Sequence, residues 1–145
     1  REQHRLPLNS YRVHTSSHDT GMDIEYLFSK QLRFGGGVKY EYITTMFNAT
    51  FPSHWLSLNT EWIWYRIAGE RLFFSGTVDR VISEYAGSLP YETANGLPVG
   101  WTWSGAMRYE KRINQFVSAG GFIQFRKRAE QKSILSANLE VKAYF

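Results

Sequence analysis

Alternation of apolar and polar residues constrains this chain more than any other feature of its sequence. At the C-terminal end, Leu139, Val141 and Phe145 stand on one side of the alternation, and Glu140 and Lys142 stand on the other. Successive side chains of a β-strand point to opposite faces, so a period of two is typical of a strand with one apolar face. No segment of comparable length has the period of a helix. The sequence therefore predicts an all-β chain.

The alternation is clear in seven segments, at residues 22–28, 34–46, 56–64, 71–79, 101–110, 117–126 and 135–145. Tight turns are expected at FSKQL, IAGER and EKRINQ, on the side where the chain ends. Long loops rich in Gly, Pro and Asn are expected on the other side, at NATFPSH and EYAGSLPYETANGLPVG. The segment FRKRAEQKS, on the long-loop side, fits either a loop or two strand extensions joined by a tight turn. This pattern predicts an antiparallel up-and-down meander.

Length and composition predict one domain over residues 1–145, because 145 residues fit a single domain and no linker interrupts the pattern. Residues 1–20 are the weakest part of the pattern. Leu8–His14 either forms an eighth strand that rises to a loop at TSSHD, or belongs to an N-terminal arm. No apolar run approaches the roughly 18 residues of a transmembrane helix. The absence of cysteine excludes disulfides and thiolate metal sites.

The two predicted strand faces differ sharply. One face carries charges of both signs: Glu25, Lys39, Glu41, Glu61, Arg71, Arg108, Glu110, Glu140 and Lys142. The other face carries aromatic residues near the strand ends: Tyr26, Phe28, Tyr40, Tyr42, Trp62, Trp64, Trp101, Trp103, Tyr109 and Phe125. The interior of an eight-stranded barrel barely holds ordinary side chains, so these rings are difficult to place inside one. Facing outward, they fit the two aromatic girdles of a membrane barrel.

These observations predict a transmembrane β-barrel with a charged lumen. It has eight strands if it is complete; alternatively, the chain supplies the C-terminal strands of a larger barrel. In a narrow ring the inward charges are expected to pair and plug the lumen, because buried charges need partners. In a larger barrel the same charges would line a water-filled path.

The closing segment NLEVKAYF resembles the C-terminal signal of Gram-negative outer-membrane β-barrel proteins, with alternate hydrophobic residues and a terminal aromatic. The resemblance implies that the barrel-assembly machinery reads Leu139, Val141 and Phe145 during insertion. It implies an outer-membrane location with a periplasmic C-terminus and extracellular long loops. Expected partners are outer-membrane lipid, lipopolysaccharide and, in a larger barrel, further membrane subunits.

The function expected from these features is that of a non-enzymatic membrane anchor, scaffold or surface-interaction module. Part of a larger pore or secretion barrel is one alternative. A lipid-modifying enzyme is another, because His14, His18 and His54 are expected in loops on one rim with Ser and Asp beside them. No nucleophile elbow is present, and no catalytic, cofactor or metal residue is predicted. A net charge of +4 without a basic run gives no support for nucleic-acid binding.

Overall fold

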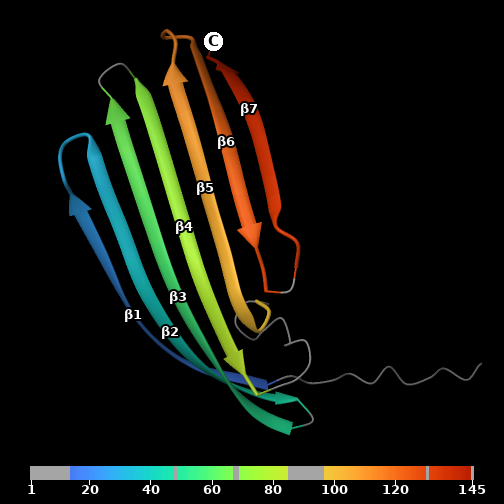
Figure 1. The fold of residues 1–145 in the computed structure, drawn as a ribbon. Helices are drawn as coiled ribbons and strands as arrows, with labels where there is room; N and C mark the ends of the chain where they lie inside the picture. The colour runs from blue at the N-terminus through green and yellow to red at the C-terminus, as the bar shows by residue number, and fades with distance from the viewer. Residues whose placement is uncertain (1–13, 48, 67–68, 85–96, 130, 145) are drawn as a thin grey trace, which may run out of the picture.

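The computed structural model describes residues 14–47, 49–66, 69–84, 97–129 and 131–144. These residues form seven antiparallel strands in one sheet, in the order β1 to β7 (Figure 1). The strands are β1 (His14–Leu27), β2 (Leu32–Phe47), β3 (Ala49–Arg66), β4 (Glu70–Ser83), β5 (Gly100–Arg112), β6 (Val117–Lys127) and β7 (Ile134–Ala143). The prediction of an all-β, up-and-down meander is confirmed.

Two predicted loops are strands. The segment TSSHD lies inside β1, and most of NATFPSH lies inside β3, so both loop assignments were wrong. Both segments pair with the long strand β2: Ser17 lies opposite Ile43, and Phe51 lies opposite Thr45. Ser, Thr and Asn favour turns only as a local preference, and a neighbouring strand that extends the ladder overrides it. Of the proposed eighth strand, residues 8–13 lie outside the described residues.

The short turns and the end of β7 share one rim of the sheet (Figure 1). In the turn between β1 and β2, the Ser29 hydroxyl accepts the backbone N–H groups of Gln31 and Leu32. In the turn between β5 and β6, the Asn114 side-chain oxygen accepts the N–H of Phe116 at 2.8 Å. The N–H of Tyr144, just after β7, donates to the carbonyl of Phe116 at 2.7 Å. The C-terminal strand therefore ends beside this turn, as the meander predicts.

The described sheet is open. Its edges are β1 and β7, each paired with one neighbour only. Both strands run toward the rim of short turns, so they point in the same direction (Figure 1). The closed ring that the sequence predicted is not formed by the described residues.

Burial separates the two faces of the sheet. The most buried polar side chains are all on the face of the predicted charges: Thr45, Ser53, Ser57, Asp79, Thr102 and Ser118. Ile43 and Val81 form a small apolar core on this same face, packed against Trp55 and Leu97. The opposite face has no buried residue among those whose burial is described. Because one curved layer makes up the described sheet, we call the more buried side the concave face and the other the convex face.

Three glycine positions show how closely neighbouring groups approach the sheet. A Cβ at Gly37 would collide with the Asp23 carboxylate, and a Cβ at Gly36 would meet the Phe34 ring at 3.3 Å. Neighbouring side chains therefore lie over the glycine run of β2. At Gly120 the obstacle is rigid, since a Cβ would lie 2.7 Å from the carbonyl oxygen of Tyr109.

Replacing Gly120 with alanine should lower the free energy of unfolding by about 1–3 kcal/mol, because the clash is with backbone and relief needs a strand shift. Gly105→Ala is the matched control, since its Cβ would have its nearest contact at an ordinary 3.5 Å. That variant should be as stable as the parent chain or more stable by about 0.5–1 kcal/mol, because alanine loses less backbone conformational entropy on folding than glycine does. Urea unfolding of both variants in nonionic detergent measures the difference; equal stabilities would contradict the register of β5 and β6.

Candidate functional site on the concave face

The cross-strand register places all nine predicted charges on the concave face. Gly35 lies opposite both Glu25 and Glu61, and Gly120 lies opposite both Glu110 and Glu140. The remaining members follow from the same ladder: Lys39, Glu41, Arg71, Arg108 and Lys142. The structure brings these residues onto one surface. Their role as a lumen lining stays a prediction.

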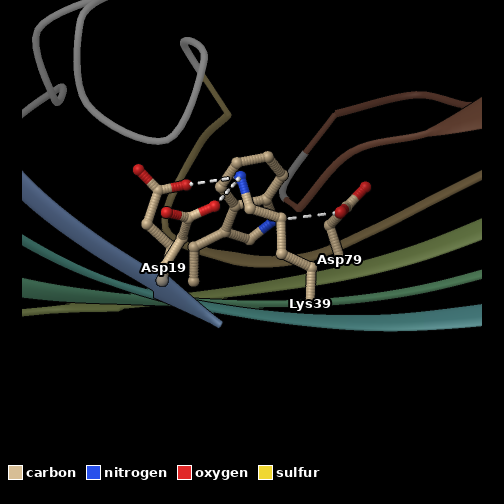
Figure 2. A network of polar contacts seen from close by, with 5 residues as sticks. Asp19, Lys39 and Asp79 are labelled. Atoms are coloured by element: carbon tan, nitrogen blue, oxygen red, sulfur yellow. Dashed lines mark hydrogen bonds and ion pairs between the residues drawn. The ribbon is translucent and has the colours of Figure 1, made fainter. Parts of the chain in front are cut away.

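A polar network joins β1 to β4 on this face (Figure 2). Lys39 Nζ lies 3.0 Å from Glu41 Oε2 and 3.7 Å from Asp19 Oδ2. The same ammonium lies over the Trp55 ring, 5.0 Å from its centroid. The Trp55 Nε1–H in turn donates to Asp79 Oδ1 at 3.0 Å. The Lys39 ammonium thus contacts two carboxylates and an aromatic ring. The indole of that ring is hydrogen-bonded to a buried aspartate, which extends the network to β4.

A second charged group spans β5, β6 and β7. Arg108 Nη2 and Lys142 Nζ approach the same oxygen, Glu140 Oε2, at 3.4 and 3.3 Å. Arg108 reaches across β6 to make this contact. Gly120 lies between Glu110 and Glu140 in the register and leaves the crossing free of a side chain. Two cations therefore share one carboxylate.

Charge is unevenly distributed over the concave face. The described concave positions of β1–β3 carry five carboxylates and two cations: Asp19, Asp23, Glu25, Glu41 and Glu61 against Arg33 and Lys39. Those of β4–β7 carry five cations and three carboxylates: Arg71, Arg108, Arg112, Arg126 and Lys142 against Asp79, Glu110 and Glu140. The face therefore has an acidic half and a basic half.

The convex face carries nine of the ten predicted aromatic residues, and Phe28 lies in the first turn. Trp62, Trp101 and Trp103 remain 42–48% exposed. The charged residues on the convex face of the described strands stand toward the strand ends: Arg66, Glu70, Arg80, Lys111 and Lys127. Between Glu70 and Arg80, the convex positions of β4 hold no charge. An exposed apolar band therefore crosses the middle of the sheet.

The predicted assembly-signal residues fall partly on this band. Leu139 and Val141 lie on the convex face of β7 and are 91% and 72% exposed. Phe145 lies outside the described residues. The reading of these residues by an assembly machinery stays a prediction.

The histidines do not form the predicted rim group. His18 and His54 lie inside strands, on the convex face, on either side of Tyr42 in the register. The Tyr40 hydroxyl and His54 Nδ1 are 2.7 Å apart. Asp19 and Ser53 point to the opposite, concave face, so the sheet separates the acid and this serine from both imidazoles. The loop placement was wrong because it treated polar strand residues as turn residues; the side chain of His14 is outside the described residues.

The described part of the chain holds no cluster of three or more His, Cys, Asp or Glu residues able to bind a metal ion. Within the same ranges, no helix has the length and apolar character needed to cross a bilayer. Comparison with protein-family models, curated proteins and solved structures finds no match for this chain.

The network at Lys39 generates a stability prediction. Lys39→Met should lower the free energy of unfolding by about 1–2 kcal/mol, because Glu41, only 14% exposed, loses its charged donor. Adding Glu41→Gln should recover most of that loss, since the less exposed carboxylate is then removed and the remaining one, Asp19, is 64% exposed to water. Urea unfolding of the single and double variants in detergent measures the coupling.

Arg33→Met is the control, because its partner Glu25 is 54% exposed and such surface pairs contribute below about 1 kcal/mol. Equal losses at Lys39 and Arg33 would show that the network has no special role in stability.

Proposed function

We propose that this chain forms the wall of an integral outer-membrane β-barrel and acts as a membrane anchor or scaffold. The apolar band on the convex face carries this proposal. Glu70 and Arg80 bound the band on β4 and are ten residues apart. At about 3.3 Å per residue they stand about 33 Å apart along the strand, and a tilt of about 40° reduces this to about 25 Å of height. That is the height of the lipid-facing band of outer-membrane barrels.

The aromatic residues fit the two edges of this band. Trp64 and Tyr109 lie one position inside the charged row at the short-turn rim, and Tyr40 and Trp101 lie at the level of Arg80. Trp and Tyr rings are favoured at the membrane–water interface, because they combine an apolar body with a polar tip. Arg80 lies over the Trp101 ring, 5.1 Å from its centroid, where its charge can reach the head groups.

A shallow apolar hollow in the middle of the band supports contact with lipid chains. It has a volume of about 420 Å³ and is centred on Gly76 and Gly105, which lie opposite one another. Leu58, Phe74 and Trp103 stand around it. In water such a surface would be a strong driver of association, whereas lipid tails cover it without a protein partner.

The open edges restrict how such a wall closes. A lipid-exposed sheet cannot leave backbone N–H and C=O groups unpaired, so β1 and β7 both need a further neighbour. The two edges run in the same direction and cannot close on one another in antiparallel fashion. Antiparallel closure therefore needs an odd number of further strands, with the first beside β7 running away from the short-turn rim.

A second candidate function, the wall of a larger transport barrel, is favoured by the concave face. Its ion pairs among the described residues join side chains on the same or nearby strands, as in Lys39–Glu41 and Arg108–Glu140. In the described part of the chain no ion pair joins the acidic half to the basic half, so each half of the open sheet keeps its own excess of charge. In a larger barrel, this concave face would line a water-filled path.

Arginine substitutions at different depths test the membrane proposal. Leu58 is 53% exposed on the convex face, so facing water the change Leu58→Arg would alter stability by at most about 0.5 kcal/mol. Inside the lipid-facing band, level with Val78 and therefore between the midplane and the Arg80 edge, it should lower the free energy of unfolding by about 1–3 kcal/mol. Ile82→Arg, beyond Arg80, should lower it by about 0–1 kcal/mol. Unfolding from lipid vesicles measures all variants.

Asn59→Arg is the matched control on the adjacent, concave position and should leave stability nearly unchanged. A loss at Leu58 without a smaller loss at Ile82 would indicate a protein partner on the convex face, and no loss at Leu58 would refute the membrane proposal.

Planar-bilayer recordings separate the anchor from the transport wall. An anchor with a narrow ring should give no stable conductance steps. Large steps of uniform size, altered in ion selectivity by reversing charge at Arg126, would establish the transport barrel instead. Arg80→Glu on the convex face should leave the selectivity of such a pore unchanged and is the control.

A further inference from the structure

A hollow of about 540 Å³ opens on the basic half of the concave face, between β3 and β7. Its apolar floor departs from the polar pattern of this face. Ile63, Phe73 and Phe122 line it from three different strands, and each is half-buried. A volume of this size lies within the range of small-molecule pockets, about 300–1,000 Å³. Accessible apolar side chains on a face otherwise lined by polar groups favour a ligand with an apolar body.

Three cations surround this floor: Arg71, Arg108 and Lys142. The Arg71 guanidinium donates to the Tyr65 hydroxyl at 3.2 Å, and no described carboxylate lies within ion-pair distance of it. Arg108 and Lys142 share the single oxygen Glu140 Oε2. The cations therefore have spare hydrogen-bonding capacity, since each guanidinium alone carries five N–H donors.

The register places Arg108 directly between Phe73 and Phe122 on the neighbouring strands. A guanidinium and two flanking rings thus stand side by side at the edge of the hollow. Arg71 stands opposite Glu110, one concave position nearer the short-turn rim. Charge-assisted donors beside an apolar floor match a molecule that carries an acidic group at one end.

We propose that this hollow binds small amphiphilic organic anions, with an aromatic or alkyl body against Phe73 and Phe122 and a carboxylate held by Arg71 and Arg108. The Glu110 carboxylate at the edge repels additional negative charge, so the hollow favours a ligand with a single carboxylate. Lys142 supplies long-range attraction for the anion. The basic half of the concave face is therefore a recognition surface for organic acids.

The inference deepens the proposed function, because it assigns a ligand class to the concave face of the same barrel wall. It rests on that face being open to water and does not depend on lipid contact at the convex face. Binding to the detergent-solubilised chain tests it separately, since the arginine series in vesicles reports on the convex face alone.

Isothermal titration with 2-naphthoate, in nonionic detergent, is the direct experiment. Saturable binding is expected, weakened by added salt because the contacts are ionic. The neutral analogue 2-naphthamide should bind at least tenfold more weakly, and acetate, which lacks the apolar body, should not bind measurably. Titration of 2-naphthoate into protein-free micelles corrects for partitioning into detergent.

Arg108→Gln should weaken 2-naphthoate binding about tenfold, which corresponds to the loss of one charge-assisted hydrogen bond. Arg33→Gln is the matched control: both side chains are 46% exposed and each pairs with one glutamate, but Arg33 lies on the acidic half. Phe122→Ala should weaken binding of 2-naphthoate although every charge is retained. Arg108→Lys should bind 2-naphthoate more tightly than Arg108→Gln but less tightly than the parent chain. Circular dichroism of each variant reports whether the sheet is intact.

Equal binding of the acid and the amide would overturn the proposal, as would equal loss in Arg33→Gln and Arg108→Gln. If Arg108→Gln does not fold, Phe122→Ala and Arg71→Gln decide the matter: unchanged affinity in both would remove the site.

Discussion

The antiparallel hydrogen-bond ladder is the constraint on which the rest of this structure depends. Each cross-strand pair puts two side chains on the same face. Once the register between two strands is fixed, every residue of both strands is assigned to one side of the sheet. Because the pairing runs without a break from β1 to β7, charges separated by more than a hundred residues share one surface. Glu25 and Lys142 lie on the same face for this reason alone.

The distribution of burial is the reverse of that in a water-soluble sheet with one packed face. Asp79 and Thr102 are 7% and 4% exposed, while Leu58 and Leu139 are 53% and 91% exposed. Several polar groups on the concave side have partners: the Trp55 indole donates to Asp79, and Lys39 pairs with Glu41. Among the described residues, the buried Thr102 hydroxyl is the exception and has no hydrogen-bond partner. Exposed leucines on the convex side have no comparable compensation in water. The proposed lipid contact resolves this imbalance, since lipid tails accept apolar side chains and leave the polar network to the inner surface.

Much of the architecture was predictable because the alternation is strong. Trp62 and Trp64 are two positions apart in one strand, so they lie on the same face in any register. The turns at FSKQL and EKRINQ were predicted from breaks in the alternation, and Ser29 and Asn114 stabilise them in the structure through side-chain hydrogen bonds to the backbone. The predictions failed where polar residues without a strong local preference lay beside a long partner strand. His18 and His54 are such cases, because pairing with β2 rather than local sequence decides that they are in strands.

The sequence by itself determined the strand rhythm, the order of turns and the contents of each face, because side-chain direction in a strand depends only on position along the chain. It also indicated that the aromatic face is difficult to pack inside a small barrel, because the rings are large. Only the tertiary structure decided which distant residues meet. Arg108 lies between Phe73 and Phe122, and reaches Glu140 over Gly120, because three separate pairings happen to bring those positions level. Register between strands depends on the whole ladder and on turn lengths, so no local pattern in the sequence specifies the hollow that these residues form.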